Sequence, residues 1–150
     1  LSTSSAASDV YKRQVLEMVR SVDLSDYMLP NPATVSATDD LFQAIDSIVE
    51  HRISGVCVVD DDCMLVGVLS EMDCLRAILG GIYNAAANAG QVCEYMTTAV
   101  ISCDIRDDLV SVAEDMLKHG HRRRPVVDHG RLVGQITCRQ LLRVISDFDK

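Results

Sequence analysis

Tryptophan is absent from the 150-residue chain, and aromatic residues make up only 4% of it. A surface that stacks nucleic-acid bases uses aromatic side chains, so this composition argues against such a surface. Basic residues are also in the minority, with 14 Lys and Arg against 22 Asp and Glu and a net charge of −8. We therefore expect no general affinity for nucleic-acid phosphates.

Long apolar runs are missing as well. The stretch 56–59, Val-Cys-Val-Val, is typical of the apolar runs here, whereas a helix that crosses a bilayer needs ~20 such residues. We therefore expect no transmembrane helix and no membrane partner. The cytoplasmic location that we expect follows instead from the cysteines described next. The hydrophobic share of 48% is nevertheless that of an ordered globular protein, and the length suits about one domain.

The six cysteines contain no Cys-x-x-Cys pair, so the spacing typical of zinc sites is lacking. Cys57 lies in an apolar run, where a free thiol behaves as a small hydrophobic side chain. We expect six reduced thiols and no metal site. No nucleophile elbow, phosphate-binding loop or dinucleotide fingerprint occurs, so we expect no catalytic residue and no catalytic cofactor.

The first residues of the chain are small and polar. They lack an apolar core long enough for a signal peptide. We therefore expect residues 1–14 to be a disordered or non-native leader that takes no part in the fold.

An internal repeat organises the rest of the chain. Three short segments recur at a displacement of 68 residues and a fourth, after one deletion, at 67. The pairs are 26–28 with 94–96, 39–41 with 107–109, 58–60 with 126–128, and 65–67 with 132–134. Because four matches occur in the same order at nearly one spacing, the chain is a tandem duplication.

Each half carries the same pattern of elements. A short strand near 34–36 or 100–102 precedes an amphipathic helix, whose apolar residues follow helical spacing from 41 to 49 and from 109 to 117. Two strands and a closing helix, near 71–79 and 138–146, complete the unit. The pattern predicts an α+β fold of two β-α-β-β-α repeats, at 15–79 and 92–147. A linker at 80–91 joins them, with a helix stop at Gly80-Gly81 and an Ala-rich helical turn.

This arrangement resembles a tandem pair of cystathionine β-synthase (CBS) domains, a Bateman module. The segments that carry the resemblance are residues 26–28, 34–36, 52–60 and 67–73 in the first half and 94–96, 123–128 and 134–137 in the second. The resemblance implies two domains about a pseudo-twofold axis, which form a homodimer. It also implies an adenosine-containing ligand (AMP, ADP or ATP, in some members S-adenosylmethionine or NAD) in clefts between the domains.

The resemblance also implies a set of binding residues: Ser36, Ser54, Gly55, Val56, Ser70, Asp73, Ser102, Arg123, Arg124 and Thr137. Two positions depart from the family pattern. Cys57 replaces a proline that Pro125 keeps, and Gln140 stands where Asp73 keeps the ribose-binding aspartate. We therefore expect the first-half site to bind about tenfold more tightly, because hydrogen bonds to a charged group are the stronger ones.

Two of these groups also have a purely structural interpretation. Ser70 and Asp73, like Thr137 and Gln140, fit a capping box at a helix start. The same geometry suits a phosphate at the helix N-terminus and a ribose on the carboxylate. The basic run at 121–124 is either a solvated turn or a phosphate clamp. Since successive strand residues face opposite sides, only one or two of its arginines can share a cleft, with Arg124 favoured over Arg122.

The sequence leaves three functional hypotheses. The first is a stand-alone regulatory module that senses an adenine nucleotide and is not an enzyme. The second is a ligand-independent assembly module that acts on a protein partner. The third is a fragment of a larger channel, transporter or enzyme subunit, although the chain ends at Lys150 soon after its last helix. Apolar residues on the closing helices favour a homodimer in each case, namely Leu75, Ile78, Leu79, Leu142, Val144 and Ile145.

Overall fold

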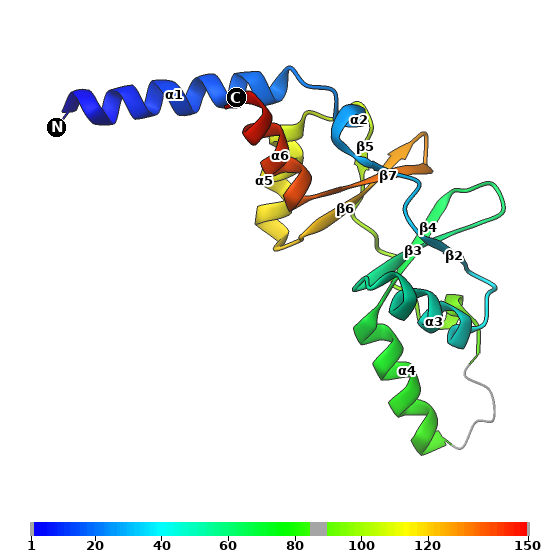
Figure 1. The fold of residues 1–150 in the computed structure, drawn as a ribbon. Helices are drawn as coiled ribbons and strands as arrows, with labels where there is room; N and C mark the ends of the chain where they lie inside the picture. The colour runs from blue at the N-terminus through cyan, green and yellow to red at the C-terminus, as the bar shows by residue number, and fades with distance from the viewer. Residues whose placement is uncertain (1, 85–89, 150) are drawn as a thin grey trace. The chain divides into compact units, whose positions relative to one another are not determined.

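Helices alternate with short strands along the chain in the computed structural model, which describes residues 2–84 and 90–149 (Figure 1). The first half contains α1 (Ser2–Arg20), α2 (Leu24–Tyr27), β1 (Leu29–Pro30), β2 (Thr34–Ser36), α3 (Leu41–His51), β3 (Gly55–Val59), β4 (Leu65–Ser70) and α4 (Glu71–Asn84). The second contains the 3-10 turn η1 (Val92–Glu94), β5 (Cys103–Asp104), α5 (Leu109–His119), β6 (Arg123–Asp128), β7 (Arg131–Thr137) and α6 (Cys138–Phe148). The predicted order β-α-β-β-α is confirmed in both repeats, and the fold class is α+β. The early strand of the second repeat begins slightly later than predicted, at Cys103.

The described chain divides into two compact units, and neither unit consists of one repeat alone. Unit 1 contains residues 1–30, 102–126 and 133–150; unit 2 contains residues 31–101 and 127–132. Unit 2 has the three-stranded sheet β2-β3-β4, in which β2 is parallel and β4 antiparallel to β3. Unit 1 takes most of the sheet β1-β7-β6-β5, whose edge strand β1 comes from the other end of the chain.

Amphipathic helices close the core of each unit. In unit 2, Leu41, Ala44 and Ile48 face the sheet from α3 at the predicted helical spacing. In unit 1, Leu109, Val112 and Met116 do the same from α5. The expected amphipathic faces are therefore the buried ones.

The two halves exchange their leading segments. Leu24, which precedes the first repeat's strands, is 1% exposed within the core that contains α5 and α6, while Val92 is fully buried in the core that contains α3 and α4. Met28 and Met96 follow Leu24 and Val92 and lie over two equivalent glycines. A Cβ at Gly134 would stand 2.5 Å from Met28 Sδ, and a Cβ at Gly67 would stand 2.6 Å from Met96 Sδ. Strand glycines therefore mark where each exchanged segment approaches closely.

The N-terminal residues differ from the prediction of a disordered leader, because Ser2–Arg20 form α1. Neither proline nor glycine interrupts the sequence before Pro30, so nothing breaks a helix there. Val15 and Val19 pack against the unit 1 core, and Tyr11 donates a hydrogen bond of 3.0 Å to Asp149. The apolar residues near the C-terminal end of α1 thus anchor a segment that composition alone predicts to be disordered.

The Gly80-Gly81 pair also differs from prediction, because α4 continues through it to Asn84. A glycine inside a helix costs about 1 kcal/mol relative to alanine, which is too little to end a helix by itself. The predicted helical turn in the Ala-rich segment falls on residues 85–89, outside the described residues. Among the helices of the described chain, none combines the length and apolarity needed to cross a membrane.

The six cysteines, all within the described chain, form no disulfide; three are buried and three exposed. Burial raises the pKa of the Cys103 thiol from 9.0 to about 12. We expect Cys63, Cys93 and Cys138 to react with a thiol reagent at pH 8 at least tenfold faster than Cys103, because the thiolate is the nucleophile.

Mass-resolved labelling would measure these rates. Since the raised pKa keeps Cys103 protonated in the folded state, its contribution to stability is complete below pH 9 and is lost as the pH rises from 9 toward 12. Equal labelling rates for all six thiols would contradict this prediction.

Candidate functional site

The start of α4 brings three of the predicted site residues together. Gly55 of β3 pairs with Ser70 of β4, and the Glu71 N–H donates to the Ser54 carbonyl at 2.9 Å. Ser54, Gly55 and Ser70 therefore lie at one end of the unit 2 sheet. Val56, also predicted here, points its side chain into the core at 2% exposure, so only its backbone can face a ligand.

Asp73 forms the capping box with Ser70. The Ser70 N–H donates to Asp73 Oδ2 at 3.0 Å, and the Asp73 N–H donates to Ser70 Oγ at the same distance. The remaining oxygen, Oδ1, accepts from Arg76 at 2.9 Å in an ion pair whose arginine is 69% exposed. A ligand hydroxyl that reaches Asp73 therefore competes with an exposed surface arginine, which is a weak competitor.

Ser36 lies apart from this group. Its strand β2 pairs Ser36 with Val59, four residues along β3 from Gly55, and successive strand residues advance about 3.3 Å. Its backbone N–H donates to Asp39 at 2.9 Å, and its hydroxyl lies 3.1 Å from that of Thr38. Ser36 therefore lies at the end of β2, before the turn that leads to α3, and at the other end of β3 from Ser70. This register does not support the prediction that Ser36 joins Ser70.

The start of α6 repeats the geometry of the start of α4. The Cys138 N–H donates to the Arg122 carbonyl at 3.0 Å, as Glu71 does to Ser54. Thr137 Oγ1 accepts from the Gln140 N–H at 3.4 Å and donates its own proton to the Gln140 side-chain oxygen. These bonds make Arg122 the structural counterpart of Ser54 and Arg123 that of Gly55.

Arg124 is buried, contrary to the prediction that it faces a ligand cleft. Its side chain is 2% exposed and ion-pairs with Asp115 of α5, which lowers the pKa of that carboxyl mainly through the hydrogen bond. Its Nη2 donates to His121 Nδ1 at 3.2 Å, since a guanidinium has no acceptor. This network was not predicted, although the repeat indicates it: the positions equivalent to Arg124, Asp115 and His121 are Val56, Ser47 and Ile53.

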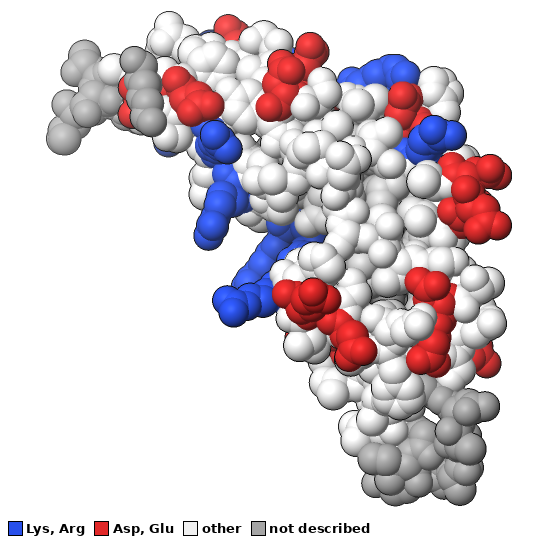
Figure 2. Space-filling view, turned by 45° about the vertical axis from the view of Figure 1, so that its right-hand side comes forward, with Lys and Arg blue, Asp and Glu red and all other residues white. Residues whose placement is uncertain are grey.

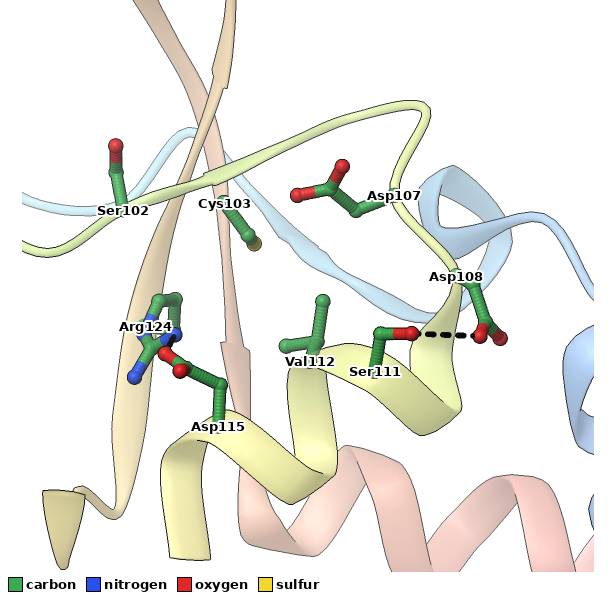
Figure 3. A pocket seen from close by; sticks show the side chains of 8 residues that line it. All are labelled: Ser102, Cys103, Asp107, Asp108, Ser111, Val112, Asp115 and Arg124. Atoms are coloured by element: carbon green, nitrogen blue, oxygen red, sulfur yellow. Dashed lines mark hydrogen bonds and ion pairs between the residues drawn. The ribbon is translucent and has the colours of Figure 1, made fainter. Parts of the chain in front are cut away.

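Arg124 lines a pocket of about 270 Å³ beside α5, together with the predicted residue Ser102 (Figure 3). The guanidinium Nε of Arg124 has no hydrogen-bond partner there. The other lining residues are Cys103, Asp107, Asp108, Ser111, Val112 and Asp115. Arg123 and Thr137 do not line it, so the predicted second-repeat residues fall into two groups.

Ser102 is also not the counterpart of Ser36. The Asp104 N–H donates to Asp107 at 2.9 Å, as the Ser36 N–H does to Asp39, so Asp104 occupies the equivalent place. The displacement of 68 residues gives the same correspondence, which the prediction of Ser102 overlooked. No cluster of three or more metal-ligating side chains is found among residues 2–84 and 90–149.

Comparison with known proteins gives a consistent family. The family model for the CBS domain matches residues 24–80 and 92–147. An uncharacterized protein of Methanocaldococcus jannaschii is 31% identical over 81% of this chain, which covers 42% of that protein. The chain thus spans less than half the length of this relative.

Two solved structures extend the comparison. CBSX2 of Arabidopsis thaliana, crystallised with AMP, is 27% identical with a TM-score of 0.75, over 85% of this chain and 98% of that one. A CBS domain pair in complex with 5'-methylthioadenosine and S-adenosyl-L-methionine is 25% identical with a TM-score of 0.67, over 85% and 98%. Both similar structures therefore hold adenosine-containing ligands.

Proposed function

Because the chain belongs to the CBS domain family, as two such domains in tandem, we propose that it is a regulatory module that binds an adenosine-containing nucleotide and catalyses no reaction. The ligands we propose are AMP, ADP or ATP. The observation that carries this proposal is the start of α4, where Ser54, Gly55, Ser70 and Asp73 meet at one end of a sheet.

Each group there suits a part of the ligand. The Ser70 hydroxyl and the backbone N–H groups of the first helical turn can donate to an oxygen of the ligand. Asp73 can accept from ribose hydroxyls as charge-assisted hydrogen bonds. Gly55 has no side chain to cover its own backbone, and the close packing of β4 keeps this position small, since a Cβ there would stand 3.2 Å from the Leu69 carbonyl oxygen. We propose the same role for Thr137 and Arg123 at α6, and leave Arg124, Ser102 and Ser36 outside the site.

A thermal-shift panel with AMP, ADP, ATP, NAD and S-adenosylmethionine tests the proposal. A ligand at one hundred times its Kd adds about 2.7 kcal/mol to the free energy of unfolding, which raises the melting temperature measurably. We expect a shift with at least one adenine nucleotide and none with matched guanosine nucleotides. No shift with any member of the panel would contradict the proposal and favour the assembly role.

Asp73→Ala is expected to weaken adenosine binding about tenfold or more at the α4 site, because it removes a charged hydrogen-bond acceptor worth ~1.5–3 kcal/mol. Gln140→Ala should change affinity little. Calorimetry on both variants measures the two effects.

Asp73→Asn is the matched control, because it retains an oxygen for the Ser70 N–H while losing the charge. Circular dichroism should show all three variants folded. Equal losses for the Asp73 and Gln140 variants, or none for Asp73→Ala, would return Asp73 to its capping role alone.

An assembly role is the second candidate, and exposed apolar side chains favour it. On α4, Met72, Leu75 and Leu79 are each more than half exposed, and on α6 Leu142 is 67% exposed. Val144, predicted for the same surface, is instead fully buried in the unit 1 core. We propose a homodimer that covers these leucines, with a regulated protein as a further partner.

Light scattering tests the homodimer directly. At micromolar concentration we expect about twice the monomer mass of 16.4 kDa. Leu75→Ser combined with Leu79→Ser should shift the protein to monomer without unfolding it, because both side chains already face solvent in the single chain. A wild-type protein of monomer mass would contradict the homodimer.

A further inference from the structure

The two helix starts have the same hydrogen bonds but very different charges. In the first repeat the site positions are Ser54, Gly55, Glu71, Met72 and Asp73. The positions equivalent to these by the shared backbone bonds are Arg122, Arg123, Cys138, Arg139 and Gln140. The first set carries two negative charges and the second carries three positive charges. A ligand with a charged group therefore meets opposite fields at the two places.

The arginines at α6 are available to a ligand. Arg122 and Arg139 are exposed, and Arg123 is partly exposed. Because Arg124 turns toward α5 and neighbouring strand residues alternate, Arg123 faces the opposite side of β6. The one basic side chain next to Asp73, Arg76, is by contrast ion-paired with that carboxylate. Its counterpart Arg143 has the uncharged Gln140 at the equivalent place.

The net charges of the two units differ in the same direction as those of the two sites. Unit 2 contains eleven acidic and three basic residues, a net charge of −8, whereas unit 1 contains eleven of each and is neutral. All of the chain's net charge therefore belongs to the unit with the α4 site. Figure 2 shows basic side chains gathered on part of the face in view, with acidic side chains beside some of them.

Resting on the proposed function, we infer that the two sites select adenosine ligands by charge. The α6 site takes phosphate-bearing ligands, whose anionic oxygens the guanidinium groups of Arg122 and Arg123 can bind bidentately. The α4 site prefers adenosyl ligands without phosphate and binds AMP more weakly than the α6 site does, because Glu71 and Asp73 repel an anion while Asp73 still accepts from the ribose. The first-half site is expected to bind about tenfold more tightly because it has Asp73. On this inference that difference holds for adenosine and is reversed for AMP.

Calorimetry with AMP and with adenosine separates the two sites. Arg122→Ser with Arg123→Gly installs the residues of the first repeat at the second. We expect this variant to lower AMP affinity at least tenfold and adenosine affinity less than threefold. Asp73→Ala should do the converse, lowering adenosine affinity and leaving the tighter AMP site intact. Raising the NaCl concentration should weaken AMP binding and leave adenosine binding unchanged.

Lys12→Gln with Lys118→Gln removes two exposed basic charges of the same unit and is the matched control, which should bind both ligands as the wild type does. The inference is overturned if the arginine variant loses both ligands equally, if it keeps its AMP affinity, or if the control loses as much. A wild type that binds adenosine and AMP with one affinity at both sites would overturn the inference and retain the proposed function. Binding of neither ligand would overturn both.

Discussion

Asp115→Ser is expected to lower the melting temperature by roughly 5 °C, because it leaves the buried Arg124 guanidinium without its counter-charge. Arg124 is 2% exposed, and its Nε already has no hydrogen-bond partner. Differential scanning calorimetry measures the shift. Since Arg124 lowers the pKa of Asp115 from 3.8, the difference between wild type and variant should persist at neutral pH and vanish as the pH falls below 3.8 through the lowered value.

Arg124→Val with Asp115→Ser provides the matched control, because it restores the Val and Ser that the first repeat has at positions 56 and 47. Replacing a buried ion pair with an apolar side chain is often neutral or stabilising. We expect the double variant to melt within about 2 °C of the wild type, although valine leaves part of the arginine's volume unfilled. A double variant that is less stable than Asp115→Ser alone would show that the arginine itself, rather than its pairing, supports the core.

Leu24→Ala is expected to destabilise unit 1 by about 3 kcal/mol, although this residue belongs to the first repeat in the sequence. Leu24 is 1% exposed and packs in the core formed with α5 and α6. Hydrogen exchange followed by mass spectrometry would locate the loss. Peptides of β6, β7 and α6 that belong to unit 1 should lose protection, while peptides of β3 and β4 should keep theirs.

Val92→Ala is the reciprocal variant, since Val92 stands 68 residues after Leu24 and is fully buried in unit 2. Its effect should be smaller, because valine loses two carbons where leucine loses three, and it should appear in β3 and β4. If Leu24→Ala instead opened unit 2, the exchange of leading segments described here would be wrong.

Much of this fold was accessible from the sequence because its signals are local or repeated. The spacing of Leu41, Ala44 and Ile48 predicts a helix face from periodicity alone, and the displacement of 68 residues transfers each element to the second half. The exchange of leading segments was not accessible. Periodicity specifies which face of an element is buried but not the partner that buries it, so Leu24 and Val92 read equally well as core residues of either half.

The candidate site also contains some features that the sequence predicts and others that it does not. The caps at Ser70 and Thr137 are local hydrogen bonds within four residues, and sequence spacing predicts them well. The direction of Arg124 was harder to predict, because it depends on Asp115 of α5, and the sequence indicates this pair only through its absence from the equivalent positions of the first repeat. Ser36 was assigned to the site by resemblance, and a resemblance does not supply the register of β2 against β3 that separates Ser36 from Ser70.

The exchanged segments affect the order in which the two units can fold during synthesis at the ribosome. Residues 31–101 contain nearly all of unit 2 and lack only 127–132, so this unit can approach its native packing while later residues are still being made. Residues 1–30 emerge before this segment but pack with residues 102–126 and 133–150, which emerge after it. Residues 1–30 therefore wait longer for their partners than residues 31–101 do. Because β1 pairs with β7 more than one hundred residues later, we expect closure of this edge strand to be a late, high-contact-order step of folding.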